Sequence, residues 1–189
     1  MLALFEQHPL LMEKLPYVSL GDFPTLVEKL ERLGQAINAP QLYVKREDAS
    51  GRLYGGNKVR ALEFLFGEAL RDGYKQVIAL GFPASCQALA QAIYAKHLGI
   101  QSHAFLFSQA VLRQTRQHLL MYQSIGAEIH PIQSIFPHMI RHRLKYGNFP
   151  KLLEASSPLG MVGYVNAGYE LKRQIEQGLM PEPILYISL

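Results

Sequence analysis

Apolar and polar positions follow two different periods along most of the chain, and these periods predict its secondary structure. In the segment 58–72, apolar side chains recur every three or four positions, which indicates a helix with one buried face. The segment 76–80, QVIAL, is a short and continuous apolar run, which is typical of a strand buried on both faces. The same two patterns predict further helices over 85–99, 108–126, 137–146 and 163–178, and further strands over 102–107, 127–132 and 183–189.

The alternation of helices with strands of these lengths defines the fold class. It predicts an α/β fold with a parallel sheet covered by helices on both faces. Gly73 and Gly99 are expected to end two of the helices, and Ser108 is expected to cap the start of a third. The N-terminal part is less regular, and we expect a loop and a helix over 16–30 and a strand that runs into a turn over 41–48. In parallel sheets of this kind, ligands bind beyond the carboxyl ends of the strands.

Composition limits the classes of protein that the chain can represent. Of its 189 residues, 49% are hydrophobic and 18% are charged, which is enough apolar material for one domain or two small ones. The single cysteine allows no intrachain disulfide and favours a cytoplasmic location. The net charge of +4 is spread over the chain, and its densest cluster, 141–147, is typical of a solvated helix face, so we expect no nucleic-acid partner. Because no apolar run reaches about 18 residues, we expect no membrane partner either.

The stretch YGGNKVRAL, residues 54–62, places a lysine at the start of the helix predicted over 58–72. Its two glycines permit backbone angles that other residues avoid, and Asn57 is a good N-cap residue. Lys58 then lies in the first turn, where the positive end of the helix dipole and any desolvation both favour the neutral amine. A neutral amine is a nucleophile that forms an imine with an aldehyde. From the local pattern alone, a solvent-facing lysine after a glycine turn is the simpler interpretation.

A longer segment changes that balance. The run VKREDASGRLYGGNKVRALEFLFGEAL, residues 44–70, resembles the lysine region of pyridoxal-phosphate enzymes of the tryptophan-synthase-β fold type. Within that group it is most similar to the 1-aminocyclopropane-1-carboxylate deaminase and D-cysteine desulfhydrase family, and PLGMVGYVNAGYEL, residues 158–171, resembles the G-x-x-G-Y segment of that family. The resemblance extends from about Leu15 to the end of the chain. It implies that Lys58 binds pyridoxal phosphate as an imine and then moves a proton at the substrate α-carbon, while the cofactor serves as the electron sink.

The turn after the strand predicted over 76–80 holds the second set of candidate residues. In the resembled family this turn reads Q-S-N-H, whereas here it reads Ala84, Ser85, Cys86 and Gln87. The resemblance carries over only the serine, and it implies that Ser85 holds or activates the substrate. Cys86 stands where the family has an asparagine beside the phenolic oxygen of the cofactor, so Cys86 and Asn57 are the further cofactor-side candidates. A cysteine at a helix start is alternatively a candidate nucleophile, but the sequence marks no histidine as its base.

Two other patterns carry less weight. His138 and His142 are four positions apart, as some zinc ligands on a helix are, but no third ligand is evident from the sequence, so we predict no metal site. Tyr43, Tyr54 and Tyr164 are candidates to line a ring-binding cavity, although such tyrosines more often pack half-buried with the hydroxyl toward solvent.

The resemblance also implies a domain organisation and a reaction. Residues 1–60 and 161–189 would belong to a large domain that is truncated after Leu189, and 61–160 would form a small α/β domain. The family's glycine-rich loop for the cofactor phosphate would follow Leu189, so we expect this chain alone to bind the cofactor weakly. The implied activity is a pyridoxal-phosphate-dependent deaminase or desulfhydrase that acts on a small amino acid, of the 1-aminocyclopropane-1-carboxylate or D-cysteine type, and releases ammonia and a 2-oxo acid. The alternative is a non-catalytic remnant that acts at most as a binding or assembly module, and a homodimer is compatible with either.

Overall fold

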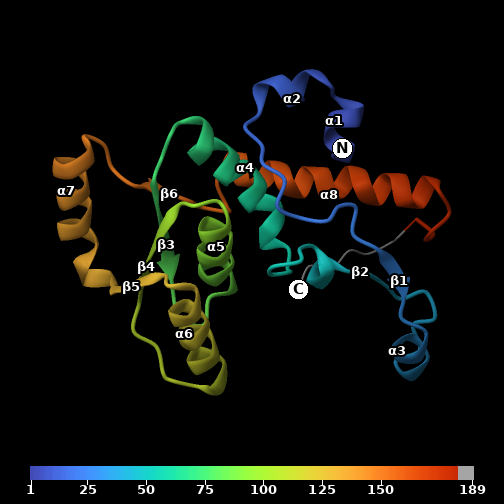
Figure 1. Cartoon of the computed structure of the whole chain (residues 1–189). Helices are drawn as coiled ribbons and strands as arrows, with labels where there is room; N and C mark the ends of the chain where they lie inside the picture. The colour runs from blue at the N-terminus through green and yellow to red at the C-terminus, as the bar shows by residue number, and fades with distance from the viewer. Residues whose placement is uncertain (183–189) are drawn as a thin grey trace.

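A computed structural model describes residues 1–182 of the chain, which contain a four-stranded parallel sheet on the left of the view in Figure 1. The strand order is β5-β4-β3-β6, and the strands are β3 (Gln76–Gly81), β4 (Gln101–Leu106), β5 (Glu128–Pro131) and β6 (Lys151–Leu152). The strands predicted over 76–80, 102–107 and 127–132 are confirmed as β3, β4 and β5. The strand predicted over 183–189 lies outside the described residues.

Helices cover both faces of this sheet. Alternate side chains of a strand point in opposite directions, so each strand packs against helices on both faces. Ala104 and Leu106 of β4 pack on one face, in an apolar cluster that includes residues of α5 and α6. Phe105 points to the other face, where its ring centroid lies 5.1 Å from that of His138 in α7. These helices are α5 (Cys86–His97), α6 (Arg113–Ile125) and α7 (Ile135–Tyr146). The predicted α/β fold with helices on both faces is therefore confirmed.

The two longest helices, α4 (Lys58–Arg71) and α8 (Pro158–Glu176), pack against each other beside the sheet (Figure 1). Val59, Leu62 and Phe66 of α4 are fully buried in a core that includes residues of β3 and α5. Phe64, on another side of α4, packs with residues of α1. Because α4 is buried on several sides, the position of its first residue is fixed by the packing of the whole molecule.

The N-terminal part consists of short elements. They are α1 (Ala3–Gln7), α2 (Leu10–Lys14), β1 (Val27–Lys29), α3 (Glu31–Ala36), β2 (Tyr43–Lys45) and the 3-10 helix η1 (Glu47–Ala49). The prediction of a strand and a turn over 41–48 is confirmed by β2 and η1. The prediction of a helix within 16–30 is wrong, because 27–29 form a strand that pairs antiparallel with β2. Pairing with a distant segment has overridden the local pattern here.

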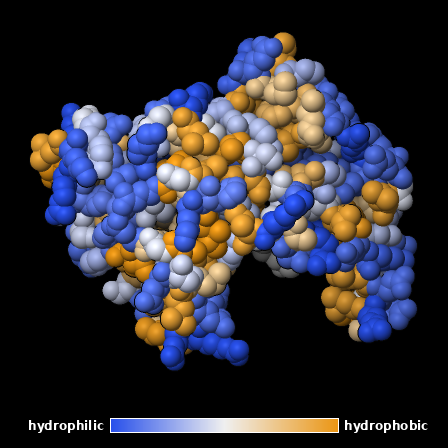
Figure 2. All heavy atoms as spheres, in the orientation of Figure 1, coloured by the Kyte–Doolittle hydropathy of each residue, from blue (hydrophilic) through white to orange (hydrophobic). Residues whose placement is uncertain are grey.

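The arm formed by β1, α3 and β2 projects from the rest of the molecule (Figure 1). Figure 2 shows hydrophobic atoms on the surface of this arm. Leu26, Leu33 and Ile37 are each at least half exposed there. Gly34 is the only buried residue of these three elements, so the arm has no apolar core of its own.

Two predicted helix boundaries are wrong. The helix predicted from residue 108 begins at Arg113, with Leu112 rather than Ser108 at the cap position. Val111 and Leu112 are 72% and 64% exposed, so no buried face supports a helix over the preceding residues. The helix predicted from residue 163 begins earlier, at Pro158, where the Ser157 side chain accepts a hydrogen bond from the Gly160 amide.

Within residues 1–182, no helix has both the length and the apolar composition that crossing a membrane requires. The division into a large and a small domain stays a prediction. All four strands of the parallel sheet lie within 61–160, the range predicted for the small domain.

Candidate active site

The loop before Lys58 needs glycine at two consecutive positions, for different reasons. A Cβ on Gly55 would come within 1.8 Å of the Asp48 carbonyl oxygen, and Gly56 has a φ of +108°. The Gly56 amide donates to the carbonyl of Glu47 at 2.8 Å, and the Ser50 hydroxyl donates to the carbonyl of Gly56 at 2.8 Å. These contacts fix the loop against η1, so that the chain enters α4 with Lys58 as its first residue.

Asn57 occupies the N-cap position of α4, as expected, but the predicted capping by its side chain is wrong. Its backbone is already helical, with φ −60° and ψ −19°, and its side chain makes no capping hydrogen bond. An N-cap side chain reaches the backbone of the first turn from an extended conformation, which Asn57 does not have. The Asn57 side chain instead lines a cavity together with Lys58.

Ser85 lies where β3 ends and α5 begins. Its backbone is extended, and its Oγ accepts a hydrogen bond from the Ala88 amide at 3.3 Å, so it is a true N-cap. Gly81, the last residue of β3, lies directly against it, since a Cβ there would be 3.2 Å from the Ser85 Oγ. Because Oγ accepts the capping bond, its own proton is available to donate to a ligand.

Lys58 and Ser85 line the same cavity, which has a volume of about 740 Å³. Leu80 near the end of β3 and Leu152 at the end of β6 form part of its wall, so it lies at the carboxyl edge of the sheet, as expected for this fold class. Its remaining lining residues are Asn57, Gln87, Leu153, Glu154, Ala155, Ser156, Met161 and Tyr164. The volume is within the usual range for sites of cofactors and small molecules.

The segment between β6 and α8 was missed by sequence reasoning. Glu154 and Ser156 line the cavity, and the Ser156 hydroxyl donates to the Glu154 carboxylate at 2.8 Å. The available signal was the Ser-Pro pair at 157–158, which is typical of a helix start and therefore of a strand-to-helix turn. In a parallel sheet, that turn lies at the same edge as Ser85.

Cys86 and two of the three tyrosines lie elsewhere. The Cys86 side chain is exposed and is not among the residues that line the cavity. It lies beside Tyr54, whose pKa is raised to about 12 by burial and then by the neighbouring thiol. Tyr164 lines the cavity, whereas Tyr43 belongs to β2 in the arm. Among the described residues that line the cavity, none is a histidine. The role of Cys86 as a cofactor contact stays a prediction.

Arg60, two residues after Lys58 in α4, is held between two carboxylates. Its guanidinium donates to Glu170 at 2.9 and 2.8 Å and to Glu47 at 2.6 and 2.8 Å, and only 1% of the side chain is exposed. Phe23 covers it, with the guanidinium carbon 4.2 Å from the ring centroid. Burial raises the pKa of Glu47, but the hydrogen bonds and charge of Arg60 outweigh burial and hold that pKa below its usual value. Arg60 therefore ties the first turn of α4 to α8 and to η1.

These features define a class of protein: an α/β fold whose ligand cavity, at the carboxyl edge of a parallel sheet, presents a lysine amine and a serine hydroxyl from two helix starts. The family model described as "Pyridoxal-phosphate dependent enzyme" matches residues 18–184. The chain belongs to this family, and pyridoxal phosphate is the cofactor of the family.

Individual relatives agree with the more specific resemblance. The chain is 31% identical to a 1-aminocyclopropane-1-carboxylate deaminase of Ralstonia pickettii, over 86% of this chain and 53% of the relative. It is also 31% identical to the bifunctional D-cysteine desulfhydrase/1-aminocyclopropane-1-carboxylate deaminase of Arabidopsis thaliana, over 83% of this chain and 43% of the relative. The chain thus spans about half the length of the curated relatives it matches.

Solved structures give the same result for the fold. The crystal structure of an ACC deaminase homologue superposes with a TM-score of 0.74 at 29% identity, and the match covers 87% of this chain and 53% of the other. A diaminopropionate ammonia lyase of Escherichia coli, at 15% identity and a TM-score of 0.61, shares the fold alone. The predicted tryptophan-synthase-β-like fold is confirmed over about half of the homologous chain.

Proposed function

We propose that this protein is a pyridoxal-phosphate-dependent deaminase or desulfhydrase that acts on a small amino acid and releases ammonia and a 2-oxo acid. The observation that carries the proposal is the meeting of Lys58 and Ser85 in one cavity, although they are 27 positions apart in sequence and belong to different helices. The named activities of the relatives point to 1-aminocyclopropane-1-carboxylate or D-cysteine as the type of substrate.

The residues of the cavity fit the ring and aldehyde portion of pyridoxal phosphate. Lys58 supplies an amine, Asn57 supplies an amide beside it, and Leu152 and Met161 supply apolar wall. When bound, the cofactor supplies an aldehyde for the amine and an electron sink for the reaction. Lys58 would hold the cofactor, and its amine would move a proton at the substrate α-carbon once the substrate has replaced it.

Ser85 would hold the substrate. Its hydroxyl proton is free to donate while its Oγ accepts from the Ala88 amide, and the start of a helix suits a carboxylate. The carboxylate of a small amino acid would therefore bind at the start of α5, with its amino group toward Lys58. The two helix starts would thus set the orientation of the substrate.

The binding part of the proposal is tested by a visible spectrum during titration with pyridoxal phosphate. We expect a band of the imine between the cofactor and Lys58, and we expect it to be absent in Lys58→Ala. The matched control is Lys96→Ala, which removes an exposed lysine from α5 and should leave the band unchanged. A flat spectrum from folded wild-type protein would support the alternative of a non-catalytic remnant.

The catalytic part is tested by measuring ammonia and 2-oxo acid from 1-aminocyclopropane-1-carboxylate and from D-cysteine, with sulfide as a further product of D-cysteine. Ser85→Ala is expected to lower kcat/KM by roughly 10- to 100-fold, as the loss of a hydrogen bond to a charged group does. Ser157→Ala is the matched control, because it removes the equivalent cap of α8 from a residue that does not line the cavity. Equal losses in both variants would assign Ser85 a structural role only. A homodimer and a cytoplasmic location stay predictions.

A further inference from the structure

Three histidines gather on the face of the sheet that α7 covers. They are His103 of β4, His130 of β5 and His138 of α7, and one ring nitrogen from each lies within 4.8 Å of the other two. None of them lines the cavity that holds Lys58. The cluster is therefore separate from the proposed active site.

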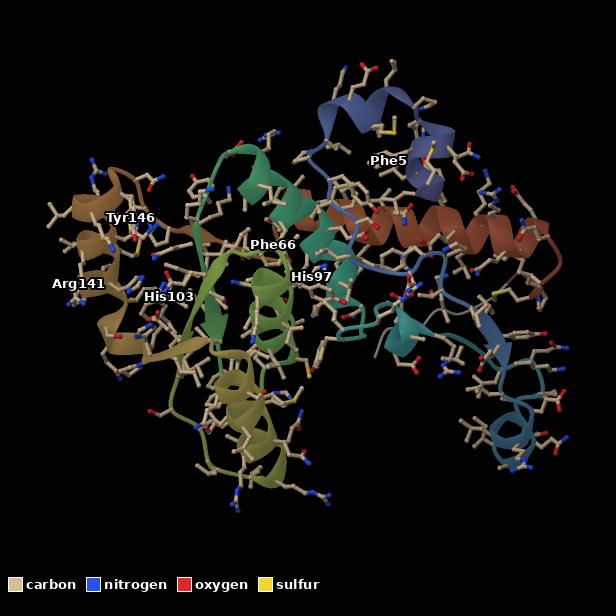
Figure 3. All side chains as sticks on the ribbon, viewed as in Figure 1. Phe5, Phe66, His97, His103, Arg141 and Tyr146 are labelled. Carbon is tan, nitrogen blue, oxygen red and sulfur yellow. The ribbon has the colours of Figure 1, made fainter. Side chains whose placement is uncertain are left out.

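Strand register explains why these residues meet. In the parallel pairing of β4 and β5, His103 is opposite Glu128 and Phe105 is opposite His130. Residues two apart on a strand share a face, so His103, Glu128 and His130 all lie on the face that α7 covers. Figure 3 shows His103 on the side of the sheet nearest α7. The His138 ring completes the group, with its centroid 4.3 Å from that of His103.

The donor atoms have the spacing of metal ligands. His103 Nδ1 and His130 Nε2 are 3.1 Å apart, and Glu128 Oε2 is 3.4 Å from the first and 3.5 Å from the second. Zinc binds histidine and carboxylate ligands at about 2.0–2.1 Å in a tetrahedron, which places neighbouring ligand atoms about 3.3 Å apart. The three atoms thus form a triangle that closely matches one face of such a tetrahedron. His138 is placed to supply the fourth ligand.

His103 Nδ1 and His130 Nε2 are within hydrogen-bond distance of each other, whereas two other ring nitrogens of the cluster lack a partner among the described residues. Within residues 1–182, His103 Nε2 and His138 Nε2 are buried and accept or donate no hydrogen bond, and the His103 residue is only 3% exposed. Leaving a buried polar atom unpaired costs roughly 1–3 kcal/mol.

A second layer of side chains orients the carboxylate. The Gln101 amide donates to Glu128 Oε1, and the Gln76 amide donates to Gln101 Oε1 at 2.6 Å. Glu128 Oε1 is thus occupied, while Oε2 faces the imidazoles. Supporting hydrogen bonds of this kind are typical of metal ligands.

We propose that His103, His130, His138 and Glu128 form a binding site for one divalent cation of the zinc class. Three imidazoles and one carboxylate suit Zn²⁺, and Co²⁺ as its spectroscopic substitute. The cation would join α7 to the edge strand β5 and to β4, so its role is to stabilise this side of the sheet. The ligand set differs from the His138 and His142 pair considered in the sequence, because His142 Nδ1 is bonded to the Asn148 carbonyl at 2.8 Å.

The test uses the full chain, treated with a chelator and freed of cofactor. Zn²⁺ is titrated in competition with a chromophoric chelator, and Co²⁺ is added separately while the visible spectrum is recorded. We expect one Zn²⁺ per chain, the intense d–d bands of tetrahedral Co²⁺, and a rise of the unfolding midpoint Tm with Zn²⁺ concentration. No binding, or an octahedral Co²⁺ spectrum, would overturn the proposal.

Variants then identify the ligands. His130→Ala is the first choice, because His130 is about a quarter exposed and its loss should not prevent folding. We expect it to weaken Zn²⁺ binding by more than about 100-fold, and Gln101→Ala, which removes the support of Glu128, by roughly 10-fold. His97→Ala, which removes an exposed histidine from the end of α5, is the matched control and should bind as the wild type does. If His130→Ala bound Zn²⁺ normally, or if His142→Ala abolished binding, the assigned ligand set would be wrong.

Discussion

Lys58 and Arg60 are two basic residues in the first turn of one helix, yet their surroundings are opposite. Lys58 lines the open cavity, and the ion pairs of the described residues do not include it. Arg60 is 1% exposed and forms paired hydrogen bonds with Glu170 and Glu47. Two positions along an α-helix correspond to a rotation of roughly 200°, so one side chain faces the cavity and the other faces α8.

The difference indicates a division of tasks. An ionised guanidinium between two carboxylates has one stable position, and it holds the first turn of α4 in place. An amine without such partners is available to react with a ligand. Precise placement of Lys58 is thus obtained from Arg60, two residues further on. Stability should therefore depend on Arg60, whereas chemistry should depend on Lys58.

The largest effect is expected when the buried cation is removed. Arg60→Ala leaves the carboxylates of Glu47 and Glu170 close together without their main counter-charge. Breaking a buried pair in this way costs about 3–5 kcal/mol of the free energy of unfolding. The measurement is denaturant unfolding at pH 7, and the imine band should be lost as the folded fraction falls.

The control for Arg60 lies on the same helix. Arg71 forms an ion pair with Asp72 at 2.8 Å, but its side chain is 54% exposed. Exposed pairs of this kind contribute at most about 1 kcal/mol, so Arg71→Ala should have a small effect. Equal losses in the two variants would contradict the role given to Arg60.

The next effect concerns Glu63, a buried carboxyl on the same helix. Its Oε1 accepts hydrogen bonds from the amides of Leu20 and Gly21, and burial raises its pKa from 4.5 to about 7. Between these two pH values the folded state binds more protons than the unfolded state, so Glu63 stabilises the fold below pH 4.5 and loses that contribution as the pH rises to about 7. The loss is at most about 1.4 kcal/mol per pH unit.

Glu63→Gln keeps an oxygen for both amides and removes the titration. His103 titrates with the opposite sign, because burial lowers its pKa to about 4, which destabilises the fold as the pH falls below 6.5. The quantity to measure is therefore the difference in unfolding free energy between Glu63→Gln and wild type. This difference should shift in favour of the variant as the pH rises from 4.5 to 7. A difference that stays constant with pH would exclude a raised pKa for Glu63.

The sequence predicted best those elements whose burial follows a simple period. The strand 76–81 is apolar over 77–80 and the helix 58–71 has an apolar stripe, and both were found nearly to the residue. The short strands β1 and β6 were not found, because three or two residues carry no period and their pairing depends on distant partners. The start of α6 was misplaced because apolar residues near Leu112 are exposed, which no local pattern reveals.

The residues of the candidate site also separate into those that local sequence patterns reveal and those that depend on strand pairing. Lys58 and Ser85 were identified from a turn chemistry and a family resemblance that are both local in the sequence. Glu154 was missed, because it enters the cavity only through the parallel pairing of β6 with β3. The histidine cluster was missed for the same reason, since His103 and His130 become neighbours only through the register of β4 and β5.

A smaller effect is expected at the loop that leads to Lys58. In Gly55→Ala, the new methyl group would collide with the Asp48 carbonyl oxygen, which is backbone and cannot rotate away. We expect a loss of about 1–3 kcal/mol in unfolding free energy, together with a weaker imine band because Lys58 is displaced. Gly168→Ala in α8 is the control, because its Cβ would meet nothing within 4 Å and alanine favours a helix. An unaltered band and stability in Gly55→Ala would show that the loop does not position Lys58.

The smallest effect on stability is expected from Lys58 itself. Lys58→Ala removes a cation from the positive end of the α4 dipole and breaks no ion pair of the described residues, so the unfolding free energy should stay within about 0.5 kcal/mol of wild type. The imine band should nevertheless vanish completely. Such a result would show that Lys58 serves the chemistry and contributes little to the stability of the fold. If Lys58→Ala instead cost more than about 1 kcal/mol, the amine would have a buried partner, and the contrast with Arg60 would disappear.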